Sequence, residues 1–133
     1  MIGPIDHIVL IDDEDDCHFV TRLILKKAGF TGSIRSFNSA YEALSAMRAG
    51  LGEVDLLLVD INMPGMTGFE FVETCEREGL LPRGGTSVIM VSSSNRPQDL
   101  NRARGMGSIN DYVEKSLTIE QFERITHAHL QRA

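Results

Sequence analysis

A short apolar run that ends in a carboxylate lies near the middle of the sequence. Residues 56–59 are Leu-Leu-Leu-Val, and Asp60 follows them directly. Such a run is typical of a strand buried on both faces of a parallel sheet. The Pro64-Gly65 pair then forces the chain to turn. Because an ionised carboxylate is costly inside a core, we expect Asp60 at the exit of the strand, where solvent or a cation can satisfy it. The alternative is that Asp60 only caps the next segment.

Four further segments have the pattern of short strands, and amphipathic segments separate them. The expected strands are 7–11, 33–37, 56–60, 88–91 and 111–114. The expected helices are 14–28, 39–50, 69–77, 97–104 and a last one that begins at Thr118. Helical spacing predicts that the core face of the first helix carries Phe19, Val20, Leu23, Ile24 and Ala28. Capping boxes are expected at 39–42 and 118–121.

Strands that alternate with helices predict a parallel sheet with helices on both faces. The length favours one domain over residues 1–133, with the flavodoxin-like (βα)5 fold and the strand order 2-1-3-4-5. In this fold the carboxyl ends of the strands meet at one edge. Asp12, Asp60, Ser92 and Lys115 each follow an expected strand, so we expect these four side chains to converge there.

Composition excludes several classes of protein. A net charge of −6 argues against direct nucleic-acid binding, which needs a basic patch. The sequence has no apolar run long enough to span a membrane and no signal-peptide pattern, so we expect a cytoplasmic protein. Cys17 and Cys75 are expected to be reduced thiols on helices. The four histidines, at positions 7, 18, 127 and 129, are expected to face solvent.

The chemistry-bearing residues resemble those of a known family over essentially the whole chain. They are the Asp12-Asp13 pair, Asp60 with its MPGMTG turn, Ser92, Tyr112 and Lys115. In this order and at these strand ends, they resemble the CheY-like receiver domain of two-component response regulators.

The resemblance implies that Asp60 accepts a phosphoryl group from the phosphohistidine of a sensor kinase or of a histidine phosphotransfer protein. It also implies a Mg²⁺ site made by Asp12, Asp13, Asp60 and the backbone carbonyl of Asn62. Oxygen ligands in an incomplete shell are what Mg²⁺ prefers. Lys115 and Ser92 would contact the phosphoryl oxygens. Ser92 and Tyr112 would form the switch that alters a protein-binding face made by the fourth helix, the last strand and the last helix.

The residue after Lys115 departs from the family pattern, and a second position bears on how the phosphoryl group is lost. The family usually has proline after the lysine, joined by a cis peptide bond, whereas this chain has Ser116. The loop is therefore expected either to keep a cis bond before a non-proline residue or to rearrange to trans. Ser94 lies two residues after Ser92, and its small side chain predicts a phosphoryl group that is not unusually long-lived.

Two alternative functions remain open. A degenerate receiver would bind partners without being phosphorylated. A Mg²⁺-dependent phosphatase with an aspartyl nucleophile would usually need a second acid two residues later, where this chain has Asn62. A P-loop enzyme is excluded, because the sequence contains no GxxxxGK[ST] motif. No residues remain for an output domain, so we expect a stand-alone receiver or one cut from a larger protein.

Overall fold

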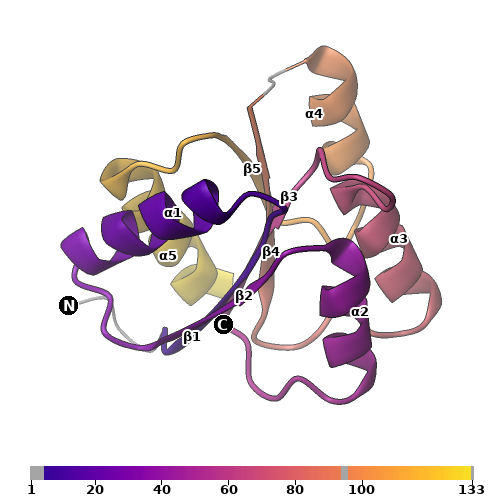
Figure 1. Cartoon of the computed structure of the whole chain (residues 1–133), viewed down its shortest axis with the longest axis horizontal. Coiled ribbons are helices and arrows are strands. Elements are labelled where there is room, and N and C mark those ends of the chain that lie inside the picture. The colour runs from indigo at the N-terminus through magenta and orange to yellow at the C-terminus, as the bar shows by residue number, and fades with distance from the viewer. Residues whose placement is uncertain (1–4, 94–95, 133) are drawn as a thin grey trace.

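The computed structural model describes residues 5–93 and 96–132, and it contains a five-stranded parallel sheet with helices on both faces (Figure 1). The strands are β1 (His7–Ile11), β2 (Ser33–Phe37), β3 (Leu56–Asp60), β4 (Ser87–Ser92) and β5 (Asp111–Glu114). The helices are α1 (Asp15–Lys27), α2 (Ala40–Arg48), α3 (Gly68–Arg77), α4 (Pro97–Arg104) and α5 (Ile119–Arg132). The sheet order is β2-β1-β3-β4-β5, which confirms the predicted fold.

The central strands divide their apolar side chains between two cores. Leu57 and Val59 belong to the core on one face of the sheet, with residues of α2, α3 and α4. Leu56 and Leu58 belong to the core on the other face, with residues of α1 and α5. Figure 1 shows the same division of the helices. This alternation follows from the two-residue period of a strand, and it leaves β3 buried along its whole length.

Helix capping was predicted only in part. The box at Thr118 and Gln121 is complete, because each backbone N–H donates to the other residue's side chain. Ser39 accepts from the backbone N–H of Glu42 at 3.1 Å, but the reciprocal backbone contact is absent among the described hydrogen bonds. A box that the sequence analysis missed, between Thr67 and Glu70, begins α3.

The prediction for the core face of α1 was wrong for Phe19, Val20 and Leu23, whereas Ala28 does pack against the core. Phe19 is 63% exposed, and Val20 and Leu23 are also exposed, whereas His18 and Leu25 are buried. The helix carries two apolar stripes, so spacing alone does not decide between them. The structure buries the stripe that includes His18, whose Nε2 lies 2.8 Å from the backbone carbonyl oxygen of Asp12. This contact satisfies a polar group that would otherwise disfavour burial.

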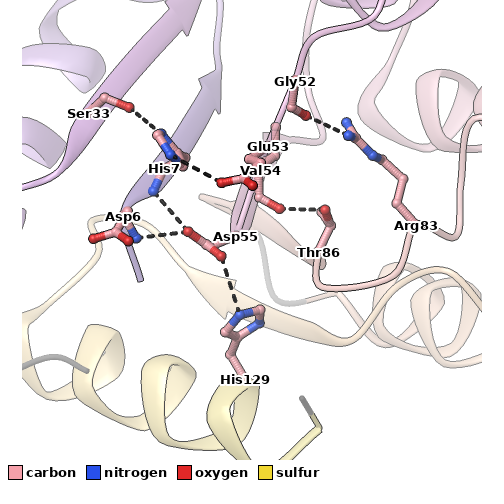
Figure 2. A network of polar contacts seen from close by, with 10 residues as sticks. All are labelled: Asp6, His7, Ser33, Gly52, Glu53, Val54, Asp55, Arg83, Thr86 and His129. Atoms are coloured by element: carbon pink, nitrogen blue, oxygen red, sulfur yellow. Dashed lines mark hydrogen bonds and ion pairs between the residues drawn. The ribbon is translucent and has the colours of Figure 1, made fainter. Parts of the chain in front are cut away.

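The expectation that the histidines face solvent was wrong for His129 as well as for His18. His129 is buried, with Nδ1 at 2.7 Å from the hydroxyl of Ser87. Figure 2 shows its ring turned toward Asp55, which also accepts hydrogen bonds from the backbone N–H groups of Asp6 and His7. This network lies at the amino ends of the strands, opposite the edge at which Asp60 ends β3.

Within residues 5–93 and 96–132, two peptide bonds are cis, Leu81–Pro82 and Lys115–Ser116. Of the two outcomes expected for the loop after β5, the structure therefore has the cis bond. Among the described residues, no helix combines the length and apolar character needed to cross a membrane.

Candidate functional site

Three carboxylates lie together where β1 and β3 end. Oxygen atoms of Asp12, Asp13 and Asp60 all lie within 4.8 Å of one another. Asp60 is 3% exposed and Asp12 is 8% exposed, whereas Asp13 faces solvent. β1 pairs directly with β3, so the parallel register brings the ends of both strands to the same edge of the sheet. The predicted convergence of these acids is therefore present in the structure.

Local hydrogen bonds fix the orientation of Asp12. Its backbone N–H donates to the carbonyl of Phe37 at the end of β2, and its side chain accepts from the backbone N–H of Glu14 at 3.0 Å. His18 lies against its carbonyl oxygen, as described above. Asp13 does not cap α1: the N-cap residue is Glu14, and it makes no side-chain capping bond. Asp13 is thus left with an exposed carboxylate beside the two buried ones.

Lys115 reaches the carboxylates from the end of β5. Its ammonium nitrogen lies 2.9 Å from Asp12 Oδ2 and 3.3 Å from Asp60 Oδ1. It also lies 3.6 Å from the sulfur of Cys17, a contact that the sequence analysis did not predict. Burial acts to lower the pKa of Lys115, but the hydrogen bond with Asp12 and the charges of both carboxylates outweigh it, so the pKa is raised. Lys115 therefore remains a cation in this site.

The pKa of Asp60 is raised above that of an ordinary aspartate. Burial and the neighbouring charge of Asp12 raise its pKa from 3.8 to about 6. Lys115 and a hydrogen bond from the backbone N–H of Asn62 act in the opposite direction. Removal from water is thus the dominant effect on this carboxyl group. Asp60 is still mainly ionised at pH 7.

Ser92 and Tyr112 complete this edge of the sheet. Ser92 is fully buried at the end of β4, and its carbonyl accepts a hydrogen bond from the backbone N–H of Lys115 at 2.8 Å. Burial raises the pKa of the half-buried Tyr112, while a hydrogen bond with the Ser92 side chain acts to lower it. The two residues predicted to form a switch therefore contact each other. Ser94, on which the phosphoryl lifetime was predicted to depend, lies outside the described residues.

The turn after β3 approaches the site closely. The backbone N–H of Gly68 donates to the carbonyl of Ile61 at 2.9 Å. A Cβ atom at Gly68 would collide with the backbone carbonyl of Asp60. Only glycine therefore lets α3 begin this close to the end of β3.

The donor set fits a hard divalent cation. Carboxylate oxygens are ligands that Mg²⁺ prefers, and three of them within one small volume leave positions for water and for substrate oxygens. Sequence reasoning found these acids and Lys115, because each follows a strand. It missed Cys17 and His18, which reach the site from the first turns of α1 and whose only sequence signal is their proximity to the acidic run.

Known response regulators resemble this chain in sequence. The family model of the response regulator receiver domain matches residues 8–127. The chain is 29% identical over 127 residues to two-component response regulator ORR1 of Oryza sativa, covering 91% of this chain and 54% of ORR1. It is 28% identical over 118 residues to two-component response regulator ARR10 of Arabidopsis thaliana, covering 89% of this chain and 20% of ARR10. The chain thus spans about half of the length of the first relative and a fifth of the second.

Solved structures resemble the fold over nearly the whole chain. A two-component response regulator from Cytophaga hutchinsonii superposes with a TM-score of 0.86 and 28% identity, covering 96% of this chain and 98% of that one. A response regulator receiver protein from Dyadobacter fermentans gives 0.77 and 29% identity, covering 93% and 97%.

Proposed function

The chain belongs to the response regulator receiver domain family, and from this premise we propose that it is a phosphoacceptor module of a two-component system. Asp60 accepts a phosphoryl group from the phosphohistidine of a sensor kinase or of a histidine phosphotransfer protein. The only chemistry of the module is the phosphorylation and dephosphorylation of its own aspartate. We propose that residues 1–133 act as one receiver domain in the cytoplasm, with protein partners, and without direct contact to nucleic acid or membrane.

The observation that carries the proposal is the position of Asp60 beside Lys115. A carboxylate oxygen of Asp60 attacks phosphorus, the phosphorus–nitrogen bond of the donor breaks, and the released imidazole takes up a proton. Negative charge stays on the transferred group, and Lys115 offsets part of it. Ser92 donates its hydroxyl hydrogen to another phosphoryl oxygen. Asp60 is suited to the attack because a pKa of about 6 leaves it ionised at neutral pH.

A bound Mg²⁺ would offset the charge that Lys115 leaves unneutralised. Asp12, Asp13 and Asp60 would hold it, together with the backbone carbonyl of Asn62. In the described structure Lys115 already lies between Asp12 and Asp60, so its ammonium and the cation share the same carboxylates.

The exposed apolar stripe of α1 supports a docking role for this helix. Phe19, Val20 and Leu23 are all at least 40% exposed. Val20 also lines a pocket of about 130 Å³ whose wall includes Asp60 and Lys115. A helical partner that packs against this stripe would bring a phosphohistidine to the carboxyl edge of the sheet. The stripe therefore suits the phosphodonor protein.

The contact between Ser92 and Tyr112 supports a switch toward α4, β5 and α5. When Ser92 turns to a phosphoryl group on Asp60, it gives up its hydrogen bond with Tyr112. The tyrosine ring, which lies in β5 beside α4, is then free to change position. A downstream protein that binds this face would sense the change.

The choice of donor separates the proposed function from a phosphatase. We would incubate the protein with phosphoramidate, a small donor with a phosphorus–nitrogen bond, and separately with a phosphomonoester. The proposal predicts one phosphoryl group on the protein from phosphoramidate and no turnover of the monoester. Asp60→Asn should abolish the adduct, whereas Asp16→Asn, an exposed acid in α1, should keep it. Sustained release of phosphate from monoesters would favour the phosphatase, and the absence of any adduct would favour a degenerate receiver.

A further inference from the structure

We infer a second ligand-binding site, at the edge of the sheet opposite Asp60. A pocket of about 210 Å³ opens there between the amino end of β4, the loop before β5 and the end of α5. Ser87, Ser108, Asn110, His129 and Arg132 are among its lining residues. None of the lining residues is an aspartate or glutamate, although the whole chain has 19 of these acids against 13 lysines and arginines.

A buried hydroxyl without a partner lines this pocket. Ser108 is 3% exposed, and its Oγ has no hydrogen-bond partner within the part of the chain that the structure describes. Leaving a buried polar atom unpaired is unfavourable, and such atoms are uncommon in native proteins. The Ser108 backbone N–H is already used, because it donates to Glu76. A turn of this side chain toward the pocket would let a ligand there accept the hydrogen bond that the chain leaves unmade.

Two more donors line the same pocket. Asn110 uses its side-chain oxygen to accept from the backbone N–H of Val88, and its NH₂ group has no acceptor among the described residues. The guanidinium of Arg132 donates to the Ser87 hydroxyl at 2.8 Å, and no ion pair with a carboxylate is found for it among the described residues. The remaining N–H groups of Arg132 are thus available to an anion.

Two other polar side chains around the pocket, His129 and Arg83, have partners elsewhere. Burial lowers the pKa of His129, which favours a neutral ring that accepts from Ser87 with Nδ1. Its Nε2 faces Asp55, as Figure 2 shows. Arg83 lines the pocket too, but Figure 2 shows its guanidinium turned toward Gly52, to whose carbonyl it donates. The free donors therefore belong to Arg132, Ser108 and Asn110.

We propose that this pocket binds a phosphate group, either as the free ion or as the monoester of a small metabolite. The site offers a guanidinium, a hydroxyl and an amide as donors, and phosphate is a multiply charged ligand that carries several acceptor oxygens. The volume is smaller than the roughly 300–1,000 Å³ typical of sites for drug-sized ligands, so only a small group fits. The proposal is independent of the function assigned to Asp60.

Phosphate titration followed by NMR tests the proposal. Sodium phosphate would be added to ¹⁵N-labelled protein in EDTA, against sodium chloride of equal ionic strength, and the amide signals of Gly107, Ser108 and Asn110 would be followed. We expect saturable shifts at these three amides, in the wild type and equally in Asp60→Asn. The unchanged response of Asp60→Asn would separate this site from the phosphoacceptor edge.

Variants and competing ligands make the test specific. Arg132→Gln should weaken phosphate binding about tenfold or more, because hydrogen bonds to charged groups are the strong ones. Ser108→Ala should weaken it about threefold without loss of stability, because the deleted hydroxyl has no partner in the chain. The matched control is Arg124→Gln, also on α5, where the arginine pairs with Asp111 instead. It should bind phosphate as the wild type does.

Two ligand comparisons complete the design. Glycerol phosphate binding tighter than inorganic phosphate would assign the pocket to a monoester, and the reverse order would assign it to the free ion. Each of three results would overturn the proposal: no saturable shift, equal binding by Arg132→Gln and the wild type, or equal affinity for acetate and phosphate.

Discussion

The ammonium of Lys115 lies 3.3 Å from the Asp60 carboxylate, although the two residues are far apart in the sequence and end different strands. The same ammonium contacts Asp12 at 2.9 Å. One cation thus holds two buried carboxylates that would otherwise repel each other. Lys115 thus offsets part of the negative charge of the three clustered carboxylates before any metal or phosphoryl group arrives.

Replacing Lys115 should therefore separate metal binding from stability. In Lys115→Met, the carboxylates lose their internal cation, and we expect the free energy of unfolding in EDTA to fall by about 2 kcal/mol. Mg²⁺ should then bind several-fold more tightly, because it no longer competes with the ammonium. Urea unfolding with and without Mg²⁺ measures both effects. Lys27→Met, at an exposed position in α1, is the control. Equal stabilisation of Lys115→Met and the wild type by Mg²⁺ would show that the ammonium does not compete with the metal.

Asp60 should make the metal-free protein less stable as the pH rises. Its pKa is about 6 in the folded chain and about 4 in the unfolded chain, so the folded state binds more protons between these values. Stability from this group is present below about pH 4 and is lost as the pH rises through 6. In EDTA at pH 7, Asp60→Asn should be more stable than the wild type by up to about 3 kcal/mol. Thermal unfolding between pH 4 and 8 would measure the difference, and a difference that does not change with pH would refute this explanation.

Even a methyl side chain at position 68 should destabilise the protein. Alanine normally favours a helix over glycine, yet a Cβ at this position would collide with the Asp60 carbonyl. We expect Gly68→Ala to lower the free energy of unfolding by about 1–3 kcal/mol and to weaken Mg²⁺ binding, because the end of β3 must shift. Gly84→Ala is a matched control, since a Cβ there meets no atom within 4 Å. Chemical denaturation of both variants checks the prediction, and equal stabilities would show that the turn tolerates a side chain.

The exposed stripe of α1 should matter for a protein donor but not for a small one. In the double variant Phe19→Ser with Leu23→Ser, we expect stability to change by no more than about 0.5 kcal/mol per site, because both side chains are exposed. Phosphotransfer from a phosphorylated histidine phosphotransfer protein should slow about tenfold or more, as expected when apolar interface anchors are removed. Phosphorylation by phosphoramidate should not change. Tyr41→Ser, an exposed aromatic on α2, serves as the control, and equal slowing with both donors would place the defect in the site itself.

The sheet and the acidic cluster were predictable because they depend on local patterns and on topology. The buried runs that end at Asp12 and Asp60 identify strands, and a parallel order brings their carboxyl ends to one edge. The same reasoning placed Lys115 there. None of this required knowledge of a side-chain conformation.

The features that sequence reasoning missed depend on tertiary pairing. His18 is buried because its Nε2 meets the Asp12 carbonyl, and His129 because it meets Ser87 and faces Asp55. Histidine spacing carries no signal for such contacts. The contact of His18 decides which face of α1 packs on the sheet, because helical spacing alone did not distinguish the two apolar stripes. The exposed stripe with Phe19 was therefore expected in the core.

The most direct test of the central claim is the intact mass of the protein after incubation with acetyl phosphate. We expect one added phosphoryl group in the presence of Mg²⁺, little or none in EDTA, and none in Asp60→Asn under either condition. A phosphoryl group that persists in Asp60→Asn, or that forms equally well in EDTA, would contradict the assignment of Asp60 as the acceptor in a metal-dependent site.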